Sequence, residues 1–200
     1  MNYRRLINPV RNRRRRYDAI VSLLGIEDCD SVLDVGCGHG LSFETFNTTN
    51  RIVGVDLNLS HHDAPNFTFR RADGAELPFA DGEFDVAVSI GCFEHITPMT
   101  KLDACVLEIN RVAKRALVVV PCITTVLEPH FHSFLWQLRS YEHRNRRGNM
   151  SLGFEPVGRH ERINYLSDDA WLNFKGFSTW KTRRYWHIFP IVRNLFVYKR

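Results

Sequence analysis

A glycine-rich loop directly after a short apolar segment constrains the fold of this chain more than any other feature. Residues 31–36 (SVLDVG) have the composition of a buried strand, and Gly36, Gly38 and Gly40 follow at every second position. Glycine lets the backbone turn sharply and approach a ligand closely, and the helix that we expect at residues 41–47 offers free N–H groups at its start. The pattern therefore predicts a strand, a tight loop and a helix in succession.

Apolar segments with the length of strands alternate with helical patterns along the rest of the chain. We expect helices at residues 16–25, 41–47, 100–114 and 167–175, and strands at residues 31–36, 51–56, 66–71, 84–90, 115–120, 177–185 and 194–199. This alternation favours an α/β fold with a doubly wound, mostly parallel sheet and helices on both faces. Because both faces of such a sheet are covered, its strands are expected to be nearly continuous in Val, Ile and Leu.

The chain has the length of one domain. We expect the 200 residues to form a single domain, 1–200, which begins with a basic N-terminal arm at residues 1–15. Residues 123–165 are rich in aromatic, histidine and arginine residues without a clear period. This stretch is too long for a simple loop, and we expect a substrate lid or insertion there.

Composition excludes several classes of protein. The five cysteines form no CxxC pair, which argues against a zinc module or a disulfide framework and favours reduced thiols in a cytoplasmic protein. No apolar run approaches the roughly 18–20 residues of a membrane span, and the arginine-rich start lacks the apolar region of a secretory signal.

The charges are segregated along the chain. Residues 1–16 contain seven arginines and no acidic residue, residues 17–138 contain seven basic and seventeen acidic residues, and residues 139–200 contain thirteen basic and five acidic residues. If the two basic ends meet in the fold, they form one positive surface that suits an anionic partner. The tail also interleaves aromatic and basic residues. This pattern suits the binding of RNA or a peripheral contact with an anionic membrane surface. The alternative is that the aromatic rings pack in the core and the charged ends of the lysine and arginine side chains lie in solvent.

Two acidic residues follow the next two predicted strands. Asp56 lies at the end of 51–56, twenty residues after Gly36, where a carboxylate accepts both hydroxyls of a ribose. Asp73 follows 66–71 and is placed to meet the edge of a base. The loop spacing is GxGxG, whereas the nicotinamide dinucleotide fingerprint is GxGxxG, so a dehydrogenase is disfavoured. A purely structural role for the glycines is the other alternative.

The segments VLDVGCGHG, GVD and RADGAELPFADGEFDVAVS together resemble the class I S-adenosylmethionine-dependent methyltransferases. The resemblance covers roughly residues 16–121. It implies a seven-stranded sheet of order 3-2-1-4-5-7-6 with an antiparallel seventh strand, and it implies S-adenosylmethionine as the cofactor.

The resemblance also implies how the cofactor lies. The loop from Gly36 through Cys37 and Gly38 to Gly40 would pack under its methionine part, with Asp34 near the amino group. Asp56 and the adjacent Leu57 would contact the ribose side. The remaining contacts would come from Asp73, Gly74 and Ala75 at the adenine and from Ser89, Ile90 and Cys92 at the sulfonium end.

Three histidines are candidates for a general base, which is useful when the acceptor is a hydroxyl. His95 follows the strand predicted at 84–90, at the edge where open α/β sheets bind ligands; the alternative is that Glu94 and His95 cap a helix and orient the loop. His130 and His132 follow the strand at 115–120 and project to one side if the chain is extended; otherwise they pack the lid.

We expect no metal site. Some relatives in this family carry an ExxEH pattern that binds a divalent metal, but Gly91 replaces the first glutamate here. A Glu94, His95, His130 and His132 cluster matches no ligand spacing that we recognise. Cys122 is a weak candidate for a cysteine nucleophile of the cytosine-C5 type, since cysteine is often simply buried. The Asp/Asn-Pro-Pro-Tyr signature of amino methyltransferases is absent, because Ile90-Gly91-Cys92-Phe93 occupies its place.

The sequence thus predicts a methyltransferase that acts on oxygen of a small-molecule, lipid- or sugar-linked acceptor, with an anionic acceptor favoured by the basic ends. An RNA methyltransferase is the first alternative. The second is a catalytically silent fold that serves as a binding subunit, which the intact glycine loop with Asp56 and Asp73 disfavours.

Overall fold

The computed structural model describes residues 9–38, 40, 46, 49, 51–58, 66–128, 133–135, 138, 164, 166–188 and 192–200. Seven strands form one sheet in the order β3-β2-β1-β4-β5-β9-β8. Their bounds are β1 Ser31–Val35, β2 Arg51–Asp56, β3 Phe67–Arg71, β4 Phe84–Ile90, β5 Ala113–Pro121, β8 Lys181–Ile188 and β9 Val192–Lys199. Strands β1 to β5 are parallel to one another, and β9 is antiparallel to both β5 and β8. The predicted order, 3-2-1-4-5-7-6 with an antiparallel seventh strand, is confirmed.

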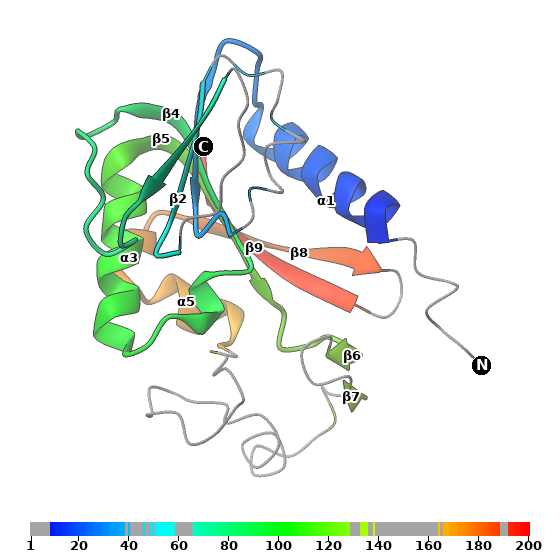
Figure 1. Ribbon diagram of the computed structural model, residues 1–200. Coiled ribbons are helices and arrows are strands. Elements are labelled where there is room, and N and C mark those ends of the chain that lie inside the picture. Colours follow the sequence, from blue (N-terminus) through cyan, green and yellow to red (C-terminus); the bar gives the residue numbers. More distant parts are fainter. Residues whose placement is uncertain are drawn as a thin grey trace.

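Helices cover both faces of this sheet (Figure 1). Helix α1 (Pro9–Leu24) packs on one face, where Tyr17, Ile20 and Leu24 are buried against strand residues such as Val32. The other face is covered by α3 (Met99–Val112), α5 (Asp168–Leu172) and the short 3-10 helix η4 (Lys175–Phe177). Alternate strand residues therefore face two separate apolar cores, as expected for a doubly wound sheet.

The first helix is longer than the sequence pattern predicts. It begins at Pro9 and not at residue 16, so residues 9–15 of the predicted basic arm are helical. Proline suits the first turn of a helix because its missing N–H has no intrahelical partner there. The apolar spacing begins only at Tyr17, and the arginine-rich first turns carry no apolar stripe. Gly25 ends the helix with φ 63°, as predicted.

The C-terminal elements differ in detail from the prediction. Helix α5 stops at Leu172, and Gly176 does not end it but lies within η4. A Cβ atom at Gly176 would lie 2.9 Å from the carbonyl oxygen of Val106, so glycine is required where η4 packs against α3. Residues 177–180 consequently belong to η4 and the turn after it, and β8 begins at Lys181. Ser167 caps α5 by accepting a hydrogen bond from the N–H of Ala170, at 3.2 Å.

Two predicted segments lie largely outside the described residues. Of the helix predicted at 41–47, only Phe46 is described; it is helical and buried. Within 123–165, the described part includes a short antiparallel pair, β6 (Leu127–Glu128) with β7 (Ser133–Phe134). Among the described residues, no helix is long and apolar enough to cross a membrane.

Candidate cofactor and acceptor site

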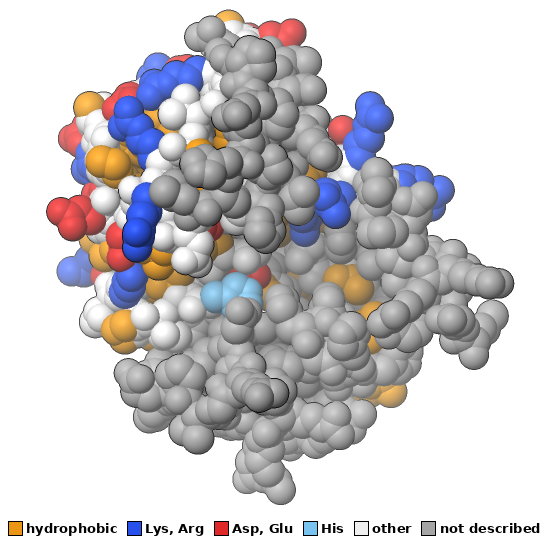
Figure 2. All heavy atoms as spheres, in the orientation of Figure 1, with side chains coloured by type: hydrophobic (Ala, Val, Ile, Leu, Met, Phe, Trp, Pro, Cys, Tyr) orange, Lys and Arg blue, Asp and Glu red, His pale blue; other side chains and the backbone are white. Residues whose placement is uncertain are grey.

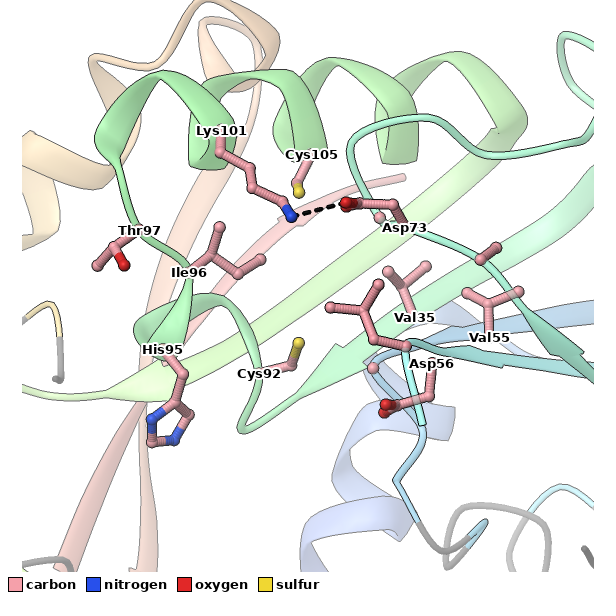
Figure 3. A pocket seen from close by; sticks show the side chains of 14 residues that line it. Val35, Val55, Asp56, Asp73, Cys92, His95, Ile96, Thr97, Lys101 and Cys105 are labelled. Carbon is pink, nitrogen blue, oxygen red and sulfur yellow. Dashed lines mark hydrogen bonds and ion pairs between the residues drawn. The ribbon is translucent and has the colours of Figure 1, made fainter. Parts of the chain in front are cut away.

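A cavity of about 290 Å³ opens at the carboxyl ends of β1 and β2 and beside the segment that follows β4 (Figure 3). This volume is near the lower end for small-molecule pockets, which span roughly 300–1,000 Å³. Fourteen residues line it: Val35, Gly36, Val55, Asp56, Leu57, Ala72, Asp73, Gly74, Cys92, His95, Ile96, Thr97, Lys101 and Cys105. The parallel strands thus bring together side chains that lie far apart in the sequence.

The glycine loop begins with a backbone that only glycine fits. The N–H of Gly36 donates to the carbonyl oxygen of Val55 at 2.8 Å, which ties the loop to β2. Its φ is 76°, and a Cβ atom there would lie 2.2 Å from the Sγ atom of Cys92. Since Cys92 comes from the segment after β4, Gly36 lets β1, β2 and that segment meet without a side chain between them.

The same loop orients the carboxylate of Asp56. The N–H of Gly38 donates to Oδ2 at 2.9 Å, and the N–H of Asn58 donates to Oδ1 at 3.0 Å. Gly38 has φ 52°, and a Cβ atom there would meet nothing within 4 Å. Asp56 is therefore a preorganised acceptor on the cavity wall, next to bare main chain with open space beside it.

Asp73 forms the second acidic position and is held by two donors. The N–H of Ala75 donates to Oδ1 at 3.0 Å, and Nζ of Lys101 donates to Oδ2 at 2.6 Å (Figure 3). These bonds lower the pKa of the Asp73 carboxyl, with Lys101 the largest cause. The carboxylate thus stays ionised over a wide pH range and faces the cavity from the third strand.

Lys101 was not predicted as a site residue. It lies in the first turn of α3, one turn before Cys105, and both line the cavity. The sequence signal that could have identified it is a lysine one helical turn before Cys105 in a segment that follows the predicted strand 84–90. The pattern alone does not reveal that its partner is Asp73, which is 28 residues away.

The thiols around the cavity are not nucleophiles. Burial raises the pKa of Cys92 to about 12, with a further contribution from the carboxylate of Glu94, and burial raises the pKa of Cys105 to about 12. Burial also raises the pKa of Cys37. Because the thiolate is the reactive form, these residues serve as apolar lining. Cys122, the cysteine considered as a nucleophile, does not line the cavity and is fully buried in the apolar core.

His95 reaches the cavity from the 3-10 helix η2 (Phe93–His95), which follows β4. Figure 3 shows His95 and Asp56 on opposite sides of Cys92, with the Asp73–Lys101 pair farther along the cavity. Glu94, next to it, is buried, and its charge lies near the buried guanidinium of Arg16 on α1. Glu94 and His95 lie within this short helix, and neither side chain caps η2 or the following helix α3, so the alternative role as a helix cap is wrong.

Asn164 holds the segment that carries His95. Its backbone N–H donates to the carbonyl oxygen of Glu94 at 2.7 Å, and its side-chain Nδ2 donates to the carbonyl oxygen of Ile96 at 2.8 Å. The residue is fully buried. Asn164 therefore binds the main chain on both sides of His95, although it lies about 70 residues away in the chain. The sequence analysis did not identify Asn164 as a site residue.

Several predicted site residues do not line this cavity. Asp34 is buried in β1, Ser89 is fully buried in β4, and Ile90 packs on the α1 face. Four more are also absent from the lining: Cys37, Gly38, Gly40 and Ala75. Of these, Gly38 and Ala75 donate backbone hydrogen bonds to the carboxylates of Asp56 and Asp73. His130 and His132 lie outside the described residues. In the part of the chain that the structure describes, no three His, Cys, Asp or Glu side chains are grouped as metal ligands.

One stretch of the chain carries the glycine loop, most of the first five strands and the cavity wall, and this stretch matches a known family. Residues 33–119 match the model of a methyltransferase domain. The chain is 30% identical over 82 residues to the 18S rRNA (guanine(1575)-N(7))-methyltransferase of Saccharomyces cerevisiae, a match that covers 37% of this chain and 30% of that protein. It is 33% identical over 79 residues to phthiotriol/phenolphthiotriol dimycocerosates methyltransferase 1 of Mycobacterium ulcerans, covering 33% and 29%. The chain thus spans about a third of the length of these relatives.

The likeness of fold extends further than the likeness of sequence. A crystal structure described as a SAM-dependent methyltransferase of Methanosarcina mazei superposes with a TM-score of 0.62 at 16% identity and covers 90% of this chain and 95% of that one. At this identity the likeness shows the fold alone. The strand order reproduces the arrangement that the sequence resemblance implies, with the matched domain at its centre. Residues 33–119 of this chain match a methyltransferase domain, and the chain has the fold of a SAM-dependent methyltransferase, as its resemblance to the class I S-adenosylmethionine-dependent methyltransferases implies.

Proposed function

We propose that this protein is an enzyme that transfers a methyl group from S-adenosylmethionine to an oxygen of a small-molecule, lipid- or sugar-linked acceptor. The observation that carries the proposal is the cavity itself, where the Asp56 and Asp73 carboxylates are held in place beside the glycine loop. Two oriented acceptors along one wall suit the hydroxyls of a ribose and the amino group of a base. An unused methyltransferase fold would not need to retain either.

The residues fit the family's cofactor. Asp56 with Leu57 would hold the ribose, Asp73 with Gly74 and Ala75 the adenine, and the loop of Gly36, Cys37, Gly38 and Gly40 the methionine part. The open space at Gly38 is the observation in favour of this placement. We assign Asp34, Ser89, Ile90 and Cys92 to the methionine and sulfonium end; Cys92 lines the cavity, and the other three would act through its wall.

When bound, S-adenosylmethionine supplies a methyl carbon that its positive sulfur activates. The protein then mainly aligns the acceptor with that carbon, and well-oriented reactants can lower the barrier by about 7–11 kcal/mol. A hydroxyl acceptor also loses a proton, and we assign its removal to a ring nitrogen of His95 on the cavity wall. His130 and His132 are the further candidates for contact with the acceptor, from the segment 123–165 that we propose as a lid of a single domain 1–200.

An RNA acceptor is the alternative. The arginines of α1 favour it, since phosphates pair well with guanidinium groups, as does the similarity to an enzyme named for 18S rRNA. The similarity to a phthiotriol dimycocerosates methyltransferase favours a lipid.

Methyl transfer from labelled cofactor to separate lipid, RNA and metabolite fractions tests the proposal. We expect label in a lipid or metabolite fraction, as a methyl on oxygen. His95→Ala should lower turnover about 10²-fold or more while it leaves cofactor affinity unchanged, and Thr100→Ala, an exposed position on α3, should change neither. Label in RNA alone would establish the alternative, and turnover unchanged in His95→Ala would remove His95 from the chemistry.

A further inference from the structure

The start of α1 places basic side chains at the same end of the molecule as the cavity. The carbonyl oxygen of Leu24, at the far end of α1, accepts a hydrogen bond from Nη1 of Arg115 at 2.9 Å, near the start of β5. The C-terminal end of α1 therefore lies at the amino edge of the parallel strands, and its arginine-rich start lies toward the carboxyl edge (Figure 1). Arg14 and Arg15 there are exposed, and Figure 2 shows basic side chains projecting on the side where Figure 1 draws α1.

The basic tail of the chain joins this surface. Helix α1 packs against β8. Burial raises the pKa of Tyr185 on β8, and the nearby positive charges of Arg15 and Arg16 partly oppose that rise. Arg183, two residues from Tyr185 on the strand, is exposed. The two basic ends of the sequence thus meet in the fold, which the charge pattern alone had left open.

Exposed leucines lie at the same edge. The β6–β7 pair follows the carboxyl end of β5, and just beyond it Leu135 is 41% exposed and Leu138 is 73% exposed. Leu135 has φ 54°, in the left-handed region that residues other than glycine adopt infrequently. Among the described residues four large apolar side chains are exposed, the others being Leu57 in the cavity and Leu107 on α3.

We propose that the basic end, which is the start of α1 with Arg14, Arg15 and Arg183, docks together with Leu135 and Leu138 on an anionic membrane surface. This inference rests on the proposed function and deepens it: the acceptor is a lipid-linked molecule, presented at the bilayer to the cavity, which opens at the same carboxyl edge of the sheet. Lipid phosphates pair with the guanidinium groups, and the leucines enter the boundary of the acyl chains. A nucleic acid would use the charge but gains nothing from exposed leucines, so the pair of features favours a membrane.

Sedimentation of the full chain with vesicles tests the proposal. Vesicles of phosphatidylcholine alone and of phosphatidylcholine with phosphatidylglycerol are compared at low and physiological salt. Each basic residue near an anionic surface is worth roughly a fivefold change in binding, so Arg14→Glu/Arg15→Glu should weaken binding to the anionic vesicles by about 25-fold or more. Both positions are exposed, and glutamate has a helix propensity similar to that of arginine, so this variant is expected to fold.

The matched control is Lys175→Glu/Lys181→Glu, which makes the same change in charge at two exposed positions away from the carboxyl edge. It should weaken vesicle binding less than the α1 variant does. Leu135→Ser/Leu138→Ser should weaken binding by a factor that salt does not remove, since that contribution is apolar. Three results would each overturn the proposal. The first is an equal loss of vesicle binding in the α1 variant and in the control, and the second is no binding of the parent protein to vesicles. The third is that the parent protein binds RNA but does not bind vesicles. Calorimetry with S-adenosylmethionine on the same preparations separates the two hypotheses. Cofactor binding without vesicle binding refutes only the membrane proposal. Vesicle binding without cofactor binding refutes the proposed function, and with it the lipid-linked acceptor, but leaves the docking surface.

Discussion

The two sides of the cavity are built in different ways. On the side of β1 and β2, main-chain hydrogen bonds fix the geometry. The N–H of Gly36 holds the loop against β2, and the N–H of Gly38 holds the Asp56 carboxylate. On the side of η2, His95 depends on distant segments, with Asn164 gripping the main chain around it. The proposed cofactor side is therefore built by main-chain bonds between the loop and the adjacent strand, whereas the proposed acceptor side depends on a contact from a residue 68 positions away along the chain. A family that keeps one cofactor and changes its acceptors would be expected to divide its site in this way.

The largest effect is expected where the two sides touch. Gly36→Ala places a Cβ atom 2.2 Å from Sγ of Cys92 at φ 76°, so the loop or the η2 segment must move. We expect S-adenosylhomocysteine affinity to fall by about 10²-fold or more, with a stability loss of order 1–3 kcal/mol from backbone strain alone. Calorimetry and thermal unfolding measure both. Gly82→Ala is the control: at φ 63° and with no atom within 4 Å of a Cβ, it introduces similar backbone strain without a steric clash. An equal loss of affinity in Gly82→Ala would show that the clash with Cys92 does not cause the loss in Gly36→Ala.

A second substitution tests the cofactor side without disturbing the other. Gly38→Val and Gly82→Val both place a branched side chain at positive φ, and both positions have no atom within 4 Å of a Cβ. Their effects on unfolding should therefore be similar. Only Gly38→Val would fill the space proposed for the cofactor, and we expect it to weaken binding at least tenfold, or about 1.4 kcal/mol. Tight binding of the cofactor by Gly38→Val would refute the placement of the loop.

Asn164→Ala tests the acceptor side. It removes the bond from Nδ2 to the Ile96 carbonyl and keeps the backbone bond to Glu94. We expect turnover to fall about tenfold, since small displacements of a reacting group are costly, with cofactor affinity unchanged. Asn110→Ala is the control, because it removes a bond from Trp180 on the far part of α3 at a similar cost of about 1 kcal/mol. If both variants lose stability but neither loses turnover, Asn164 has no positioning role.

The smallest effect is a shift in pH dependence. The pKa of Asp73 is lowered in the folded protein, chiefly by Lys101. The Asp73 carboxylate therefore stays ionised when the pH falls below the ordinary pKa of an aspartate, and it is protonated only at the lower pKa of the folded state. Lys101→Met should raise that pKa. Cofactor binding should then be lost on acidification at a higher pH than in the parent protein, with little change near neutral pH. Calorimetry at pH values on both sides of 3.8, the ordinary pKa of an aspartate, measures the midpoint, and coincident profiles would show that the ion pair does not govern binding.

The sequence predicted the local features of this molecule and missed the distant ones. The strand predicted at 84–90 agrees with the structure. Its continuous apolar run is typical of a central strand that is buried on both faces of the sheet, and β4 is buried in that way. Asp56 and Asp73 both line the cavity, and the sequence placed them at this edge because Asp56 ends one predicted strand and Asp73 closely follows the next. Lys101 and Asn164 were missed because their partners lie 28 and 68 residues away in the chain. The start of α1 was missed because its first turns carry arginines and no apolar stripe.

The division of the site depends on one claim, that a sulfonium nucleoside lies along the Asp56–Asp73 wall of the cavity. Calorimetry with purified protein tests it most directly, with S-adenosylmethionine, S-adenosylhomocysteine and NADH titrated into the parent protein and Asp56→Ala. The account predicts saturable heats for the first two ligands with the parent protein, their loss in Asp56→Ala, and no heat with NADH. Saturable heat with NADH and none with either sulfur nucleoside would contradict it.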